Sequence, residues 1–330
     1  MKARIWGARG SLPVSLNHRH IRAKLVAALE GAIGRDLDTA EKVASYVDND
    51  LGFDVRGTYG GNSSCVEVEA WDPAATTDHI ILDLGSGARP LAGAKLARYG
   101  PANPQTYHVF MSHLHWDHIM GFPFFTPAYI PGNRIVIYGC HAELETAFRR
   151  QQEPIGFPVG FEQLAATIEF VTMEPGVPVT VKDVTVTAKR QLHHGDSYGY
   201  RLEQGGQAMV YSTDSEHKLD DAAGRGAFVE FFRDADLVIF DAMYSLAECV
   251  SAKADWGHSS GAVGVELCRL AGVRTLCLFH HEPIYDDARI SGVLAETRRY
   301  ADATGETPLE VVSAYDGMEI ELAAAWSAIA

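Results

Sequence analysis

The chain alternates between short apolar runs and polar or glycine-rich turns, which predicts strands interspersed with helices. Before about Phe170, the apolar runs predict strands at residues 2–6, 64–70, 79–83, 107–111 and 134–138. After it, they predict strands at residues 179–189, 198–203, 208–212, 237–240, 275–279 and 309–312. Apolar residues at helical spacing predict helices near residues 91–98, 227–233, 259–271 and 290–300. Alternation of this kind favours an α/β protein built from two consecutive halves.

The length and composition of the chain fit one soluble domain. A chain of 330 residues that is 47% hydrophobic can bury a large core, so we expect a single domain over residues 1–330. The chain enters a strand directly, without a basic and apolar leader, and contains no run of about 18 apolar residues. The five cysteines form no C-x-x-C motif, which favours unpaired thiols and a reducing compartment. We therefore expect a cytoplasmic protein that makes no membrane contact.

Four residues of metal-binding type crowd into the segment after the strand predicted at 107–111. Residues 113–118 have the pattern His-x-His-x-Asp-His. His113 and His115 are two apart in an extended segment, so they point the same way and can bind one ion. Asp117 and His118 are adjacent where the chain turns into a helix, so they diverge and can serve a second ion. A lone histidine is usually structural, but this density after a strand predicts the centre of a dinuclear metal hydrolase.

Three later segments supply the ligands that such a centre would still need. Two hydrolytic ions require further nitrogen and oxygen ligands and a group that bridges them. His193 follows the strand that ends near Lys189, Asp214 ends the next strand but one, and His280 follows the strand at 275–279. A parallel or mixed sheet gathers functional groups along one edge, so these separated residues can converge in space.

This ordered set of ligands resembles the metallo-β-lactamase superfamily over nearly the whole chain. The resemblance is stronger to the branch that includes ribonuclease Z and small cyclic-phosphate or cyclic-nucleotide phosphodiesterases. Three segments carry it: the His193 segment running into Tyr-Gly-Tyr-Arg at 198–201, Asp-Ala-Met-Tyr at 241–244, and Trp-Gly-His-Ser-Ser at 256–260. The resemblance implies an α/β fold of the four-layer αββα sandwich type, to which an N-terminal helical insertion has been added.

The resemblance also implies a role for each ligand. The first ion is expected on His113, His115 and His193, the second on Asp117, His118 and His280, and Asp214 is expected to bridge both. The attacking group would be a hydroxide between the ions, and Asp117 is expected to take part in catalysis as well as in binding. Asp83 ends another strand and would lie beneath the ligands as a supporting carboxylate.

A proton donor for the leaving group is the remaining requirement. By the same resemblance, His258 would be the general acid and Asp241 the carboxylate that orients it. The alternative is that His258, which opens the helix predicted at 259–271, only caps or packs against that helix.

Two histidine doublets leave a choice of ligand. His193 is preferred over His194 because its six-residue distance to Gly199 matches the spacing in the resembling family. His280 is preferred over His281 because it is the first residue beyond its strand. Each neighbour could instead contact the substrate or support a ligand, and the sequence leaves this open.

The ligand chemistry limits which metal ions and which substrates suit the site. Imidazole and carboxylate without thiolate suit zinc, manganese or iron, with zinc as the default for the two divalent ions. Two cations can activate water and neutralise the oxygens of a phosphodiester, so a phosphodiesterase is predicted. A net charge of −15 opposes binding of long nucleic acid, and the stretch 143–165 is too short for an RNA-holding arm. A small phosphodiester, cyclic or a nucleotide, is therefore preferred to three alternatives: a lactonase or thioesterase, an RNA 3′-processing endonuclease, or a non-catalytic binder.

Residues 14–57 depart from the minimal pattern of the resembling family. Apolar residues at helical spacing predict helices at 21–34 and 38–51, with Thr39 as N-cap of the second. We expect this helical insertion either to lean over the metal site or to form the contact of a homodimer. A packing insertion on the surface is the alternative.

Overall fold

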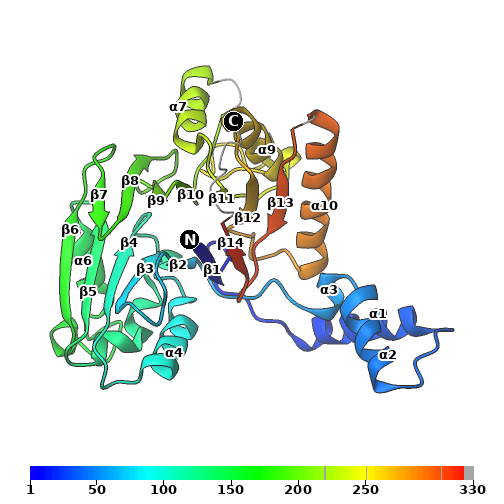
Figure 1. Ribbon diagram of the computed structural model, residues 1–330, viewed down its shortest axis with the longest axis horizontal. Coiled ribbons are helices and arrows are strands. Elements are labelled where there is room, and N and C mark those ends of the chain that lie inside the picture. The colour runs from blue at the N-terminus through cyan, green and yellow to red at the C-terminus, as the bar shows by residue number, and fades with distance from the viewer. Residues whose placement is uncertain (219–220, 250, 306, 323–330) are drawn as a thin grey trace.

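The computed structural model describes residues 1–218, 221–249, 251–305 and 307–322. Two seven-stranded sheets pack against each other, and helices cover the outer face of each sheet (Figure 1). This is the four-layer sandwich that the resemblance implied. No helix in these described ranges combines the length and the apolar character that crossing a membrane would require.

The first sheet contains the strands of the N-terminal half and one strand from the C-terminal end. Its order is β14-β1-β2-β3-β4-β5-β6. The bounds are β1 (Lys2–Gly7), β2 (Cys65–Glu69), β3 (Asp78–Leu82), β4 (Thr106–Phe110), β5 (Arg134–Gly139), β6 (Thr167–Thr172) and β14 (Glu319–Glu321). Its outer face is covered by α4 (Ala88–Tyr99), α5 (Trp116–Ile119), η2 (Phe122–Phe124), η3 (Thr126–Tyr129), α6 (Leu144–Gln151) and η4 (Phe161–Gln163).

The second sheet is formed by the C-terminal half in the order β13-β12-β11-β10-β9-β8-β7. Its strands are β7 (Val179–Val181), β8 (Val184–Arg190), β9 (Tyr198–Gln204), β10 (Gln207–Ser212), β11 (Leu237–Asp241), β12 (Thr275–Phe279) and β13 (Glu310–Ser313). The helices of this half are α7 (Ala222–Phe232), α8 (Leu246–Cys249), α9 (Gly261–Ala271) and α10 (Asp287–Thr304).

Side chains of successive strand residues enter different layers of the core. In β3, Ile80 and Leu82 belong to the core between the sheets, whereas Ile81 packs beneath the helices of the first half. In β11, Ile239 lies between the sheets and Val238 lies against the outer helices. Both faces of these strands are therefore buried, which explains why they are continuous apolar runs in the sequence.

The structure corrects several predicted elements. The strand predicted at 179–189 is a hairpin, because the chain turns at Lys182, which has φ of 54°. The helix predicted at 38–51 is a short helix, α2 (Ala40–Ser45), continued by one π-helical segment, η1 (Tyr46–Asp50). Thr39 is the N-cap of α2, as predicted, and accepts a hydrogen bond from the Lys42 amide. Strand β14 was not predicted, and it pairs with β1 in the first sheet.

The polarity of the strands determines where the functional residues gather. Strands β3 to β6 are parallel to one another, and so are strands β10 to β13. The residues that follow β3, β4, β10, β11 and β12 therefore lie at the carboxyl edges of the two sheets. Those edges are where α/β folds carry their ligands.

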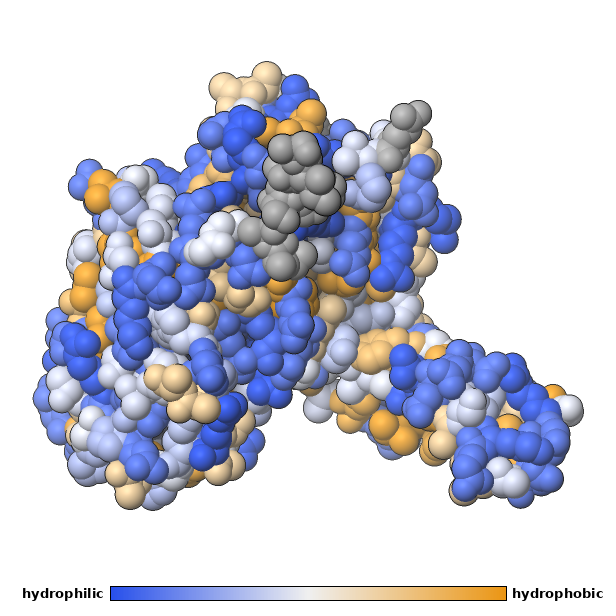
Figure 2. All heavy atoms as spheres, in the orientation of Figure 1, coloured by the Kyte–Doolittle hydropathy of each residue, from blue (hydrophilic) through white to orange (hydrophobic). Residues whose placement is uncertain are grey.

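The N-terminal insertion forms a helical arm. It consists of α1 (His18–Ala32), α2, η1 and α3 (Phe53–Arg56). The arm projects from the body of the molecule below α10, and the space-filling view shows it standing clear of the sandwich (Figures 1 and 2). No hydrogen bond or ion pair of the described residues joins α1 or α2 to a predicted metal ligand, so the structure gives no support to an insertion that leans over the site.

Candidate metal centre

The predicted ligands come together where the carboxyl edges of the two sheets meet. Seven histidine and aspartate side chains form two adjoining groups that could each hold a metal ion. They come from the segment after β4, the loop after β8, and the ends of β10 and β12: His113, His115, Asp117, His118, His193, Asp214 and His280. The convergence that strand ends predicted is therefore observed.

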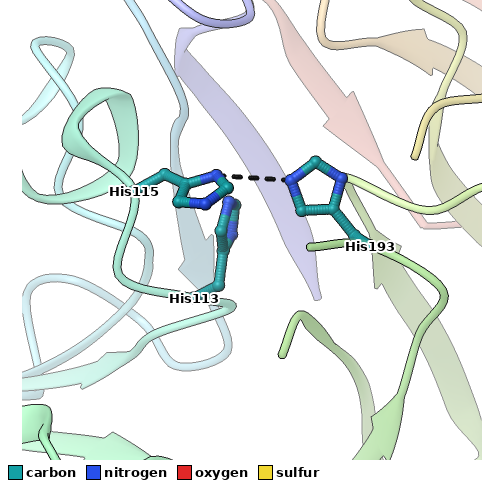
Figure 3. A group of neighbouring side chains, drawn as sticks. All are labelled: His113, His115 and His193. Atoms are coloured by element: carbon teal, nitrogen blue, oxygen red, sulfur yellow. Dashed lines mark hydrogen bonds between the residues drawn. The ribbon is translucent and has the colours of Figure 1, made fainter. Parts of the chain in front are cut away.

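The first group consists of three histidines from two loops. His113 and His115 follow β4, and His193 approaches from the loop after β8 (Figure 3). The His193 Nε2 and His115 Nδ1 atoms are 3.3 Å apart, and the rings of His113 and His115 have centroids 4.4 Å apart. Three imidazole rings thus present nitrogens to one point, which is a ligand set that suits a divalent ion such as zinc.

The second group contains two histidines and two carboxylates. His118 Nε2 lies 3.2 Å from an Asp117 oxygen, and His280 Nε2 lies 3.4 Å from the same oxygen. All four members of the group are buried: Asp117, His118, Asp214 and His280. Such a mixed nitrogen and oxygen set also suits a divalent cation.

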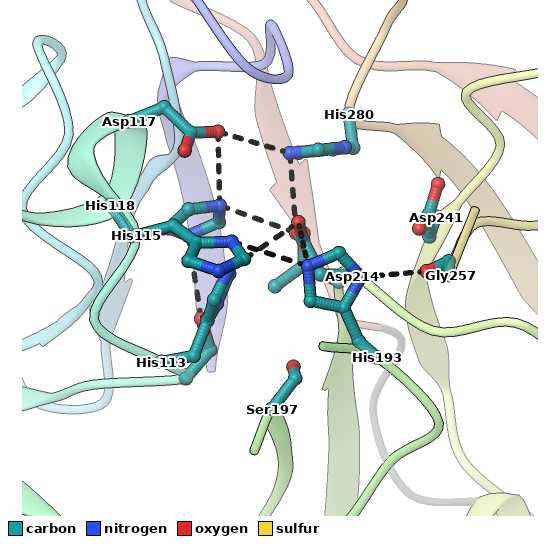
Figure 4. A network of polar contacts seen from close by, with 12 residues as sticks. His113, His115, Asp117, His118, His193, Ser197, Asp214, Asp241, Gly257 and His280 are labelled. Carbon is teal, nitrogen blue, oxygen red and sulfur yellow. Dashed lines mark hydrogen bonds and ion pairs between the residues drawn. The ribbon is translucent and has the colours of Figure 1, made fainter. Parts of the chain in front are cut away.

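Asp214 lies between the two groups (Figure 4). Its Oδ1 atom is 3.2 Å from Nε2 of His118 and 3.2 Å from Nε2 of His280, both in the second group. Its Oδ2 atom faces the first group, at 3.6 Å from Nε2 of His113 and 3.7 Å from Nε2 of His193. One carboxylate therefore directs one oxygen at each group.

Three residues of the centre have left-handed backbone conformations. Asp83, Asp214 and His280 have φ values of 59°, 42° and 62°, and each lies just beyond the end of a strand. Non-glycine residues rarely adopt this region, and the conformation costs about 1–3 kcal/mol each. Backbone strain gathered at one point of the fold, where it turns side chains toward a common centre, marks a functional site.

A buried carboxylate network supports the second group from below. Asp83 Oδ2 accepts hydrogen bonds from the Ser112 hydroxyl at 2.6 Å and the Tyr211 hydroxyl at 2.8 Å, and it lies 2.7 Å from Nδ1 of His118. Because Nδ1 is held by Asp83, the ring of His118 directs its Nε2 at the second ligand group. The supporting role that the resemblance implied for Asp83 is therefore consistent with its contacts, whereas Ser112 and Tyr211 were not predicted.

His193 is oriented in the same way by a backbone carbonyl. Its Nδ1 lies 2.8 Å from the carbonyl oxygen of Gly257, which leaves Nε2 directed at the first group (Figure 4). A Cβ atom at Gly257 would lie 2.5 Å from that Nδ1, and its φ of 81° also favours glycine. The Trp-Gly-His-Ser-Ser segment therefore contributes a glycine that positions a ligand, in addition to His258.

The donor set fits a metal because two of its buried ring nitrogens make no hydrogen bond. Among the described residues, Nε2 of His113 and Nε2 of His118 make no hydrogen bond although both are fully buried. An unsatisfied buried polar atom costs about 1–3 kcal/mol, so a group that accepts these lone pairs would stabilise the folded chain. The imidazole and carboxylate donors are the ligands that divalent transition ions prefer.

The pKa shifts differ between the ligands of the two groups. Burial and the neighbouring His118 hold the pKa of His113 well below its ordinary value, so its imidazole is neutral. Burial alone would raise the pKa of Asp214, but His280 and His118 outweigh it and lower the pKa well below its usual range. Burial would lower the pKa of His118, but Asp117 and Asp214 outweigh it and raise the pKa well above its ordinary value. Neutral imidazole and ionised carboxylate are the forms that bind a cation, so an ion that binds His118 must displace a proton.

His258 and Asp241 form a second, adjoining pair. Nδ1 of His258 is 2.7 Å from Oδ2 of Asp241, which ends β11 and is fully buried. The ring of His258 lies against those of His193 and His280, with centroids 4.9 Å and 5.1 Å away. Burial would lower the pKa of His258, but Asp241 outweighs it and raises the pKa to about 9. The imidazole is thus protonated and lies beside both groups.

The position of His258 differs from the predicted one. The helix predicted from residue 259 begins at Gly261, with Ser260 as its N-cap. His258 therefore lies in the loop before the helix, where Tyr244 N donates to the Ser259 carbonyl and ties the loop to the end of β11. Because Ser260 is the N-cap, His258 does not cap the helix.

In each histidine doublet, the structure places the two neighbours in different surroundings. His193 and His280 lie in the ligand groups, as preferred from the sequence. His281 is buried, with its Nε2 atom 2.9 Å from the carbonyl oxygen of Ala314, which gives it a packing role. His194 is exposed at the rim of a cavity of about 250 Å³ that His193 also lines.

A larger cavity opens beside His258. Its volume is about 390 Å³, and its walls include the polar Lys218 and Ser259 and the apolar Leu246 and Val263. Small-molecule sites are commonly clefts of about 300–1,000 Å³ with mixed walls of this kind. The cavity is thus placed to hold a small organic group next to His258.

Replacing Asp83 with alanine should weaken metal binding about 10- to 100-fold, because the carboxylate that orients His118 would be lost. A competition titration with a chromophoric chelator measures the change. Glu67→Gln is the matched control, since Glu67 is also buried in the first sheet and paired with Lys95, but away from the ligands. Equal metal affinity in wild type and Asp83→Ala would contradict the supporting role.

Comparison with known proteins identifies the family. The model of the beta-lactamase superfamily domain matches residues 59–281. The probable metallo-hydrolase YhfI of Bacillus subtilis is 26% identical over 246 residues, covering 71% of this chain and 89% of the relative. Ribonuclease Z of Geobacillus kaustophilus is 26% identical over 244 residues, covering 58% of this chain and 75% of the relative.

Solved structures agree with this assignment at the level of the fold. The crystal structure of YhfI covers 97% of this chain and 98% of its own, with a TM-score of 0.61 and 18% identity. It is described as a metallo-beta-lactamase fold protein. Taken with the family model and the cluster of histidine and aspartate ligands, these findings show that the chain belongs to the beta-lactamase superfamily and is a hydrolase of the metallo-β-lactamase fold with a divalent metal site.

Proposed function

We propose that this protein is a dinuclear metal-dependent phosphodiesterase that hydrolyses a small phosphodiester, cyclic or a nucleotide. The observation that carries the proposal is the position of Asp214, which directs Oδ1 at one ligand group and Oδ2 at the other. A carboxylate shared in this way would serve two cations at once, and paired cations can act on both the attacking and the leaving oxygen of a phosphoryl displacement. The relative named ribonuclease Z supports this reaction class, because the backbone of RNA is a phosphodiester.

We assign one ion to each ligand group, which is the division that the resemblance implied. The first ion would be held by His113, His115 and His193, the second by Asp117, His118 and His280, with Asp214 shared. We propose zinc, since three imidazoles without thiolate suit it, and manganese or iron would fit the same donors. When bound, the ions supply charge neutralisation for the phosphoryl oxygens and a lowered pKa for water.

The protein residues contribute proton transfer and orientation. His258 bears a proton and lies beside both ligand groups, with its second ring nitrogen, Nε2, left for the substrate because Asp241 holds Nδ1. Expulsion of an alkoxide from a phosphodiester requires such a donor, and we assign that role to His258. Asp241 keeps the imidazole in the orientation and charge state that the transfer needs.

The size and charge of the site support a small substrate. The stretch 143–165 contains α6 and η4, and it packs on the first sheet through Leu144, Phe148 and Phe161. It is therefore no extended RNA-holding arm, and the net charge of −15 disfavours a long polyanion. The cavity of about 390 Å³ beside His258 would accommodate the organic group of a mononucleotide or a similar ester.

Hydrolysis of bis(p-nitrophenyl) phosphate tests the proposal. We expect turnover by the zinc- or manganese-loaded protein, loss of turnover with a chelator, and recovery when the metal is restored. The metal content, measured alongside, should approach two ions per chain in the loaded and restored samples and fall in the chelated one. A protein that holds two ions but hydrolyses lactones or thioesters and leaves this diester intact would overturn the phosphodiesterase assignment.

A further inference from the structure

We propose that the helical arm is a dimerisation element, in which α1 packs antiparallel against α1 of a second copy around a two-fold axis. The inference concerns an interaction surface and is independent of the reaction that the metal site performs. It rests on an apolar stripe, on the direction in which the stripe faces, and on the distribution of charge along its edge.

The stripe consists of four large apolar residues at intervals of four along α1 and its C-cap. Ile21, Leu25, Leu29 and Ile33 are 45%, 59%, 69% and 79% exposed. Residues four apart lie on one face of a helix, so the four side chains form a continuous ridge. No residue of α1 is buried, and Val43 and Val47 of the adjoining segments are exposed as well.

The stripe faces away from the rest of its own chain. The opposite face of α1 carries His20, Ala23, Lys24 and Ala27, which line a groove against the start of α10. Lys24 Nζ holds this face in place through Asp287 Oδ2 at 2.6 Å and the Gly57 carbonyl at 2.7 Å. With a rotation of about 100° per residue, the ridge lies roughly half a turn from the groove. The body of the same molecule therefore cannot cover the apolar stripe.

A solitary arm of this kind would be poorly stabilised. Isolated helices of about 15 residues are marginal in water, and most helical stability in proteins comes from burying an apolar face. Here the face that would provide the burial is the exposed one, and a contiguous exposed apolar surface marks an interaction site. A covering partner supplies the missing burial, and the symmetry of the charges shows which partner fits.

The edge of the stripe carries opposite charges that complement a second copy. Arg22 and Glu30 are exposed, eight residues apart, and neither forms an ion pair within the described part of the chain. In an antiparallel pair whose two-fold axis passes at Val26, midway between them in sequence, Arg22 of each copy lies beside Glu30 of the other. The contact is therefore self-complementary, as an isologous two-fold interface must be. A second copy would bury the apolar stripe and pair both charges.

The oligomeric state of the full chain tests the proposal. Sedimentation velocity over a range of concentrations should show a dimer for wild type. Leu25→Asp/Leu29→Asp should sediment as a monomer, because two charges would be buried in the contact. Ile155→Asp is the control, since Ile155 is 97% exposed outside the arm, and it should remain dimeric. A monomeric wild type, or a dimer that survives the double substitution, would overturn the proposal.

Charge reversal tests the antiparallel register without depending on the folding of one variant. Arg22→Glu and Glu30→Arg should each raise the dimer dissociation constant about tenfold, because each replaces two attractions with two repulsions. Mixing the two variants should restore the dimer, since one copy is then acidic at both positions and the other copy is basic at both. If the mixture associated no better than either variant alone, the antiparallel register would be wrong.

Discussion

Replacing Asp214 with alanine is expected to lower phosphodiester hydrolysis by at least about a thousandfold and to reduce metal binding at both ligand groups. The two oxygens of Asp214 face different groups, Oδ1 toward His118 and Oδ2 toward His113. No other carboxylate of the centre divides its oxygens in this way among the described residues. Two ions stabilise a phosphoryl transition state by several kcal/mol, and each 1.36 kcal/mol changes the rate tenfold.

Metal content and rate should be measured on the same sample of Asp214→Ala, by elemental analysis and steady-state kinetics. Asp196→Ala is a matched control, because Asp196 also has a left-handed backbone, with φ of 56°, but pairs with Arg190 outside the ligand groups. It should retain both ions and the wild-type rate. An Asp214→Ala protein with two bound ions and full activity would show that the carboxylate does not bridge them.

Local sequence patterns were sufficient to predict which side chains gather at the candidate centre. The density of ligand residues at 113–118 is a property of the chain itself, and strand ends are recognisable from apolar runs. His193, Asp214 and His280 each follow such a run, and the parallel strands bring them to one edge. Within each doublet the preferred residue, His193 or His280, lies in a ligand group, whereas the His281 imidazole lies 2.9 Å from the Ala314 carbonyl oxygen.

Features that depend on tertiary packing were not predictable in the same way. The network around Asp83 joins Ser112 and Tyr211, which come from different sheets, so no local pattern reveals it. Strand β14 is three residues long and pairs with β1 from the far end of the sequence. The start of α9 was placed too early, because Ser259 and Ser260 look like helix residues until their pairing with Tyr244 is known.

Assembling the metal centre lowers the stability of the folded chain in the absence of metal. Asp83, Asp214 and His280 adopt strained backbone conformations, and several buried imidazole nitrogens lack hydrogen bonds within the described residues. Metal binding offsets both costs, because a ligand that binds only the folded state stabilises it. Loss of metal should therefore lower the free energy of unfolding as well as the activity.

Replacing His258 with alanine should slow hydrolysis of diesters with poor leaving groups about 10²- to 10⁴-fold while metal content stays unchanged. The imidazole touches the ligand rings but completes neither of the two proposed ion sites. An alkoxide must be protonated as it departs, whereas p-nitrophenolate departs readily without help. The rates of wild type and His258→Ala on an alkyl ester and a p-nitrophenyl ester of the same phosphate separate these cases.

The comparison between the two esters distinguishes proton donation from a merely structural role for His258. A structural defect would slow both esters by the same factor, whereas loss of a general acid slows the alkyl ester far more. His217→Gln is the control, because His217 lines the same cavity but packs against Phe228 and Phe240. Asp241→Asn should shift the rates in the same direction as His258→Ala but by less, since the imidazole would remain and lose only the partner that holds it protonated. Full activity of His258→Ala on the alkyl ester would exclude His258 as the acid.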